Sequence, residues 1–399
     1  MIDFRYHLVS IVAVFLALTV GIVLGTTMLQ DPLLDTLQAE TADLRVQSEE
    51  LRVQRDAADR VALGADQLAE ALSGDVLGRR LDGLGVAVVA APGADVDVVA
   101  ALADRVAEAD GEIVGRIDLT PDLVEHGSAS FVAAVARRAS GASEQLSGTA
   151  YEQAGTALGR ALADVGKGGG GTGGTDGDEE AGGASDGVSD GPSAPGPEES
   201  GEPREADGAA AVRAARARAG AVLDDFAESG LIALHGEPAG AADTVVVVAP
   251  AAPLFGSDGD SEAVTAALAS FVASMGGQVG PTVLAGDAAS AQPGGLIARA
   301  RSQESGLATV DLAGRPVGDV ITVLALADAL EGAPGAYGVG EGAAGFAPVP
   351  LPGPRPRPVV EPSAAPSAGA ATAGGLADGT VAQASGVPDD TPRAVEEGE

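Results

Sequence analysis

The chain has 399 residues, no cysteine and a formal net charge of -35. Such an acidic surface repels nucleic acid, so DNA and RNA binding are excluded as function classes. Without cysteine the chain can form neither disulfides nor thiolate sites for catalysis or metals. The 58 glycines and 24 prolines, beside 3% aromatic residues, indicate that a large share of the chain is linker or tail.

An apolar stretch without any charged residue occupies residues 8–29. With about 22 residues at ~1.5 Å per residue, one helix of this length crosses the ~30 Å hydrocarbon layer of a membrane. A cleaved secretory signal has a shorter apolar core that ends in a small-residue cleavage site, and residues 24–35 contain no such site. We therefore expect a retained transmembrane signal anchor and a single-pass protein of the cell membrane.

The charges beside this anchor predict its orientation. Arg5 and the α-amino group precede it, and acidic residues follow it. The positive-inside rule then places residues 1–7 in the cytoplasm and the bulk of the chain outside the cell. Gly21 and Gly25 form a GxxxG motif, which lets two membrane helices approach closely. The alternative, which the many alanines and glycines of the chain favour, is that they are ordinary glycines of an apolar helix.

A second helix is expected over residues 32–73, with Asp31 and Pro32 ending the anchor and starting this helix. Apolar residues recur in it every seven positions, at Leu37, Leu44, Leu51, Ala58, Ala65 and Leu72. That period is typical of a coiled coil, in which the leucines Leu37, Leu44 and Leu51 would bind a partner helix. The companion positions Thr41, Ser48 and Arg55 are polar, so a single helix lying on its own globular domain is the alternative.

Short apolar runs alternate with helical patterns in residues 84–165 and again in residues 208–345. Because parallel strands need crossover connections, this alternation predicts an α/β fold, with a Rossmann-like head in two halves. The expected strands are residues 85–91, 112–119, 231–234, 244–249, 283–284 and 307–312. The expected helices are residues 95–109, 121–140, 143–165, 209–229, 261–275 and 318–330.

Two segments have the composition of disordered chain. Residues 166–207 are rich in glycine and acidic residues and have almost no apolar side chains, which predicts a disordered insertion between the two halves of the head. Residues 346–399 are rich in proline and alanine. They are expected to form a disordered tail, or alternatively an extended spacer or peptide ligand of the polyproline type.

The sequence contains no recognisable catalytic motif. The expected strand at residues 85–91 leads into the sequence PGAD, without the GxGxxG of a nucleotide-binding turn, and Lys167 lacks the surrounding residues of a P-loop. The pattern GxSxG occurs only within the glycine-rich residues 183–191, with no expected strand before it and no expected helix after it, so no nucleophile elbow is indicated. This favours a non-enzymatic protein without a cofactor. Copper prefers imidazole and thioether ligands, but the histidines and methionines are not clustered. His126 and His235 are the candidate metal ligands, and the alternative is that both are ordinary loop or surface residues.

Three stretches together resemble one family. They are the opening MIDFRYHLVSIVAVFLALTVGIVLG, the segment AGRPVGDVITVLAL at residues 313–326, and Gly335-Ala-Tyr337-Gly338. They are similar to the actinobacterial copper transporter family typified by mycobacterial MctB, over residues 1–345. The resemblance implies a role in copper efflux or homeostasis at the cell envelope. A related branch, typified by the corynebacterial envelope protein SteB, implies a coiled-coil scaffold that acts with a SteA-like membrane partner in wall remodelling and division.

One apolar helix cannot line a pore alone, so a copper role requires a homo-oligomer or a partner, with copper as cargo. The scaffold alternative needs an anchor, a coiled coil and a rigid extracytoplasmic head, and its partner is a SteA-like membrane protein or a cell-wall enzyme. A third alternative is an envelope enzyme, which would need a cleft with convergent polar groups in the head.

Overall fold

The computed structural model describes residues 3–125, 127–141, 145–166, 204–251 and 258–356. Nearly all of the predicted acidic insertion lies outside these ranges, and so do the tail beyond residue 356 and the candidate ligand His126. All elements belong to one compact unit, Met1–Arg355.

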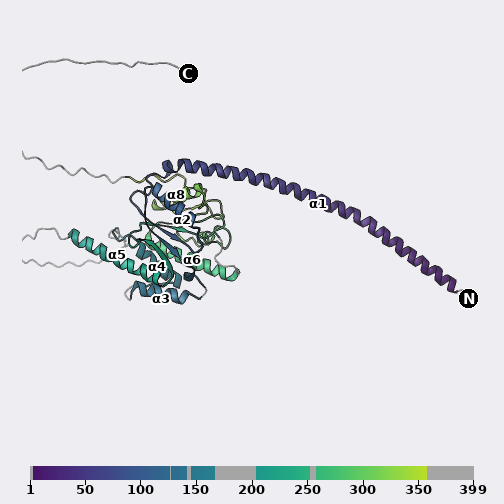
Figure 1. Cartoon of the computed structure of the whole chain (residues 1–399), viewed down its shortest axis with the longest axis horizontal. Helices are drawn as coiled ribbons and strands as arrows, with labels where there is room; N and C mark the ends of the chain where they lie inside the picture. Colours follow the sequence, from purple (N-terminus) through teal and green to yellow (C-terminus); the bar gives the residue numbers. More distant parts are fainter. Residues whose placement is uncertain (1–2, 126, 142–144, 167–203, 252–257, 357–399) are drawn as a thin grey trace, which may run out of the picture. The chain divides into compact units, whose positions relative to one another are not determined.

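The first element is a single long helix, α1 (Asp3–Leu77), drawn in purple to blue in Figure 1. Its first part, Phe4–Gly25, is long and apolar enough to cross a membrane. The helix continues through Asp31 and Pro32, so the predicted break between anchor and second helix is wrong. Proline removes one N–H from the hydrogen-bond ladder. That loss at one position does not end α1.

The head is built on a seven-stranded sheet of order β3-β2-β1-β4-β5-β6-β7. The strands are β1 (Gly85–Ala90), β2 (Glu112–Leu119), β3 (Ile232–Gly236), β4 (Thr244–Val248), β5 (Thr282–Ala285), β6 (Ala308–Val310) and β7 (Ala336–Tyr337). All neighbours are parallel except β2 and β3, so the sheet is mixed. The order reverses between β1 and β4, as in a doubly wound sheet. The α/β class is confirmed, and the strand order is consistent with a Rossmann-like head.

Helices cover both faces of this sheet. They are α2 (Val96–Glu108), α3 (Ala129–Ser140), α4 (Ala150–Leu162), α5 (Arg204–Glu228), α6 (Asp258–Val279), α7 (Leu296–Ser302) and α8 (Pro316–Leu330), with a short 3-10 helix at Pro121–Leu123. Alternate strand residues point to opposite faces, which explains the continuous apolar strands. Val89 and Val247 pack with α3 to α7, while Val88 and Val246 pack with α2, α8 and the end of α1. Figure 1 shows α2 and α8 on one side and α3, α4 and α6 on the other.

Several boundaries differ from the expected ones. The helix predicted over residues 121–140 is divided, because Gly127 has a positive φ of 91° between the 3-10 helix and α3. The helix predicted over residues 143–165 starts later, where Thr149 and Glu152 form a capping box. Helix α6 passes through the glycine pair at residues 276–277, at which it was predicted to end. The short elements α7 and β7 were not predicted.

The two predicted halves of the head are not separate packing units. Strand β3 comes from the second half but pairs with β2 of the first. Helix α4 of the first half packs closely on α6 of the second, because Gly155 and Gly159 let the backbones approach. A Cβ at Gly155 would overlap the carbonyl oxygen of Phe271.

The ordered head extends further than predicted. Part of residues 346–355, expected to be tail, is bound to the turn that follows α1. Arg79 Nη2 donates to the carbonyl oxygen of Arg355 at 2.7 Å, and Arg80 Nε donates to that of Pro352 at 3.1 Å. Burial lowers the pKa of Arg80. The prolines of this segment have no N–H group but keep their carbonyl acceptors, and Arg80 uses that of Pro352.

Candidate functional site at the carboxyl ends of β5 and β6

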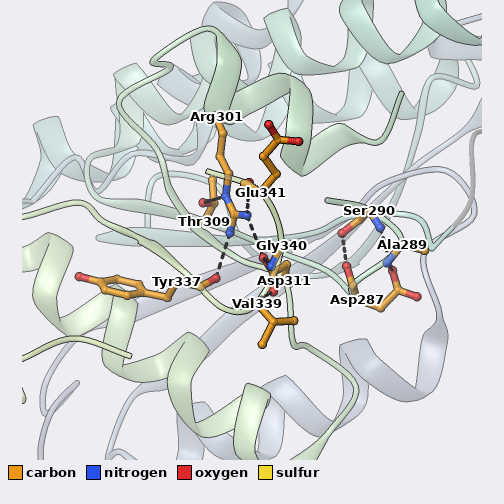
Figure 2. Close-up of polar contacts among 10 residues, drawn as sticks. All are labelled: Asp287, Ala289, Ser290, Arg301, Thr309, Asp311, Tyr337, Val339, Gly340 and Glu341. Carbon is orange, nitrogen blue, oxygen red and sulfur yellow. Dashed lines mark hydrogen bonds and ion pairs between the residues drawn. The ribbon is translucent and has the colours of Figure 1, made fainter. Parts of the chain in front are cut away.

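The loops after β5 and β6 lie at the carboxyl edge of the sheet, which is the usual place for a site in a doubly wound fold. Asp287 follows β5 and Asp311 follows β6. Oδ1 of Asp287 accepts hydrogen bonds from the N–H groups of Ala289 at 3.1 Å and Ser290 at 3.0 Å. The Ser290 hydroxyl donates to the Asp287 carbonyl at 2.6 Å. The carboxylate therefore shapes its own loop (Figure 2).

Asp311 forms a buried ion pair with Arg301 of α7. Their side chains are 0% and 6% exposed, and Arg301 Nη1 donates to Asp311 Oδ2 at 2.8 Å. The other guanidinium nitrogens donate to Thr309 Oγ1 at 3.0 Å and to the Tyr337 carbonyl at 2.9 Å. Figure 2 shows this guanidinium among its partners. A buried ion pair is tolerated when further hydrogen bonds satisfy both ions, as they do here.

The same carboxylate holds the segment after β7. Asp311 accepts hydrogen bonds from the N–H groups of Val339 at 2.8 Å and Gly340 at 2.9 Å. Gly338 has a φ of 129°, and a Cβ there would overlap the Asp311 carboxylate. The Tyr337 hydroxyl donates to Asp328 of α8, and burial, followed by this hydrogen bond, raises the pKa of Tyr337. The sequence Gly335-Ala-Tyr337-Gly338 thus holds this segment against β6 and α8.

Beside this cluster lies an open groove of about 670 Å³ between α1 and the head. Its α1 wall consists of Ala58, Val61, Ala62 and Ala65. Its head wall carries Leu312, Val317, Val339 and Phe346, with Asp287, Asp311 and Arg315 as the charged residues. Asp311 and Arg315 already have partners within the chain. The surface that the groove offers to an occupant is therefore chiefly apolar.

Below the groove, α1 is fixed to the head by two arginines. Arg315 donates through Nε at 3.1 Å and Nη2 at 2.7 Å to Oδ2 of Asp66 on α1. Arg105 of α2 donates to Glu70 and, at 3.1 Å, to Ser73 Oγ of α1. It also binds Glu108 of its own helix. Burial lowers the pKa of Arg105, but hydrogen bonds to Glu108 and Glu70 outweigh it, so its pKa is raised.

Asp319 of α8 is the buried acid at this junction. Its Oδ1 accepts a hydrogen bond from the Gly314 N–H at 2.9 Å. Burial raises the pKa of Asp319 to about 6, although the Gly314 hydrogen bond and the charge of Arg105 act in the opposite direction. Asp319 is therefore partly protonated near neutral pH.

The predicted partner-binding leucines lie on the open part of α1. Leu37, Leu44 and Leu51 are 50%, 64% and 65% exposed. A Cβ added at Gly21 or Gly25 would meet no atom within 4 Å, so neither glycine is packed against another part of the described chain. These five residues face no other element of the described part of the molecule, and their roles remain predictions.

The candidate ligand His235 lies at the edge of the sheet, far from the groove in the strand order. Its Nε2 lies 3.2 Å from Asp118 Oδ2, and Arg116 binds the same carboxylate at 2.5 and 2.9 Å. A cation at this carboxylate would face a guanidinium. Among the described residues, no three side chains of His, Asp or Glu gather closely enough to hold a metal ion.

Sequence reasoning missed the pair of Arg301 and Asp311, because a single Arg and a single Asp carry no spacing signal. The available signal was the sequence Gly335-Ala-Tyr337-Gly338, which suggested the family. The backbone that follows it contacts Asp311 directly.

The fold and these contacts define a class: a doubly wound α/β head joined to a long helix, in which the described residues contain one candidate membrane span. A family model described as "Copper transport outer membrane protein, MctB" matches residues 1–348. The chain therefore belongs to the MctB family.

Curated relatives agree with this assignment. The chain is 36% identical over 135 residues to "Copper transporter MctB" of Mycobacterium tuberculosis (strain ATCC 25618 / H37Rv), which is 34% of this chain and 43% of that protein. It is 35% identical over 128 residues to the protein of the same name in Mycobacterium leprae (strain TN), or 32% of this chain and 40% of that one. The match thus spans about two fifths of the relatives' length.

Proposed function

We propose that this chain is a non-enzymatic, membrane-anchored protein of copper homeostasis in the cell envelope that works as an oligomer or with a membrane partner. The copper role is supported by membership of the MctB family and by the name of the mycobacterial relatives. The oligomer is supported by one structural observation. The leucine face of α1 is exposed, although the helix packs tightly on the head further along.

A single membrane helix cannot form a pore, and this limits the possible mode of action. A pore needs several helices or a closed barrel around it, and the described residues contain one helix suited to a membrane. Copper as cargo therefore needs several copies of the chain or another protein. Pairing along Leu37, Leu44 and Leu51, with Gly21 and Gly25 at the contact inside the membrane, would bring copies together.

The proposed orientation keeps the amino terminus in the cytoplasm and the head outside. It is supported by Arg5 before the span and by the acidic residues that follow it. In this orientation the head and its groove face the envelope, where copper leaving the cell would be received.

Copper binding by the full-length chain in detergent tests this proposal. Isothermal calorimetry with Cu(I) and Cu(II), combined with light scattering, separates direct binding from assembly. We expect an oligomer in every condition. Stoichiometric binding that the H235A variant loses would assign copper handling to the chain itself. A monomer that binds neither ion would contradict the proposal.

A scaffold that recruits a cell-envelope partner is the second candidate, and the same exposed leucines favour it. It predicts an oligomer or complex without copper binding. Deletion of the gene distinguishes the two, because a copper role predicts higher cellular copper and copper sensitivity, whereas a scaffold predicts a defect in the cell wall alone.

A further inference from the structure

Three exposed apolar side chains mark the rim of the groove. Val61 of α1, Val339 and Phe346 are 75%, 64% and 48% exposed, and all three line the groove. We call them the groove patch. An exposed cluster of this kind on an acidic head is typical of a protein contact. Since Asp311 and Arg315 beside it are already paired, an apolar protein surface fits it better than a polar small ligand.

The leucines and the head occupy the same face of α1. Leu44 and Ala62 are 18 residues apart, and so are Leu51 and Ala69. Eighteen residues make about five turns at ~3.6 residues per turn, so each pair points in the same direction. Ala62 lines the groove, and Ala69 packs against the core of the head. A helix paired with the leucines would therefore lie on the side of α1 that carries the head.

Two copies anchored in one membrane by the same span would have parallel α1 helices in register. Paired along Leu37, Leu44 and Leu51, they must separate where the heads begin, at about Ala58, which lines the groove. Both heads then lie between the two helices, on the side where the helices diverge. The groove opens at this point, so the groove patches of the two copies would face each other across the two-fold axis.

We propose that the groove patch is a second, self-complementary contact between two copies of this chain, resting on the proposed pairing of α1. A two-fold dimer uses the same surface on both subunits, which one patch near the axis satisfies. Charge favours this patch over the rest of the head. Two chains of net charge -35 repel one another, and an uncharged apolar surface is where they can approach.

Cross-linking through introduced cysteines tests this proposal. Because the chain has no cysteine of its own, an introduced thiol is the only one in the chain. The full-length protein in membrane vesicles carries one of four substitutions: L44C, V339C, F346C or F131C. Phe131 is the matched control, since it is 49% exposed but lies on α3, on the opposite face of the sheet. A short bismaleimide is added, and dimers are measured by denaturing electrophoresis.

We expect L44C, V339C and F346C to cross-link to dimers, with at least a tenfold lower yield for F131C. Dimers of L44C without dimers of V339C or F346C would overturn the head contact while the α1 pairing stands. Such a result would assign the groove to a different partner. Failure of all four would overturn the α1 pairing and with it this proposal. Equal yields for F131C and F346C would mean random collision and would also overturn it.

Discussion

Two stretches of α1 share one heptad pattern but not one environment. In the upper stretch, residues 37–58, the leucines at heptad positions are half exposed or more. In the lower stretch, residues 62–77, the head covers α1 at Ala69 and Leu77, and Leu77 is fully buried, although the heptad residue Leu72 is still 42% exposed. A seven-residue period thus shows that a helix has an apolar face, and does not show what covers it. The interpretation of a helix that lies on its own globular domain holds for the lower stretch, and the coiled coil stays a prediction for the upper stretch.

The largest expected effect is loss of assembly without loss of folding, after substitution in the upper stretch. The L37D/L44D/L51D variant places three charges on the proposed contact, and we expect complete loss of the oligomer in light scattering. Because these side chains contact no other described element, the unfolding midpoint of the head should not change. L63D is the control, since Leu63 is 60% exposed but lies off the leucine face. An oligomer that survives the triple substitution would show that the upper stretch is not the contact.

A substitution in the lower stretch should instead reduce the stability of the head. L77A removes a fully buried side chain from the core cluster of α2 and α8. We expect a loss of about 2–5 kcal/mol in the free energy of unfolding, the usual cost of such a cavity. L51A, in the upper stretch, should change it by less than about 0.5 kcal/mol. Guanidinium unfolding of both variants, followed by circular dichroism, makes the comparison. Equal losses would mean that the two stretches do not differ as described.

Local patterns predicted much of the fold. Apolar runs located β1, β2 and β4, because buried parallel strands are continuous in hydrophobicity. The pairing partners were not predictable in the same way. Strand β3 joins β2 antiparallel, and β7 has two residues, so neither leaves a pattern that reveals its neighbour. The family resemblance pointed to Tyr337 and Gly338, yet only the structure places Arg301 and Asp311 beside them.

Two pairs of glycines with the same spacing also have different surroundings. Gly21 and Gly25 in α1 have the spacing of Gly155 and Gly159 in α4, but a Cβ at Gly155 meets the backbone of α6, whereas one at Gly25 meets nothing within 4 Å. We expect G155A to cost about 1–3 kcal/mol of head stability through overpacking. G25A should leave head stability unchanged. A neutral G155A in guanidinium unfolding would contradict the close packing of α4 on α6.

The last expected effect appears only as the pH changes, and it concerns the acid buried beneath the lower stretch. The pKa of Asp319 is raised from 3.8 to about 6, so its contribution to stability is fully present below about pH 4 and is lost as the pH rises through about 6. The loss is on the order of 3 kcal/mol. D319N keeps an oxygen that accepts the Gly314 N–H but carries no charge. It should therefore be more stable than the parent at pH 7 and about equal to it at pH 4.

The measured quantity is the difference in unfolding free energy between D319N and the parent from pH 4 to pH 8, because other carboxylates titrate in both proteins and cancel. Asp66 and Glu70 of α1 and Arg105 of α2 act on Asp319, so the difference also reports how α1 lies on the head. R105A in the D319N background removes the cation that holds Glu70. A difference that stays constant with pH would mean that the pKa of Asp319 is not raised, which would contradict its burial at the junction of α8 with the lower stretch.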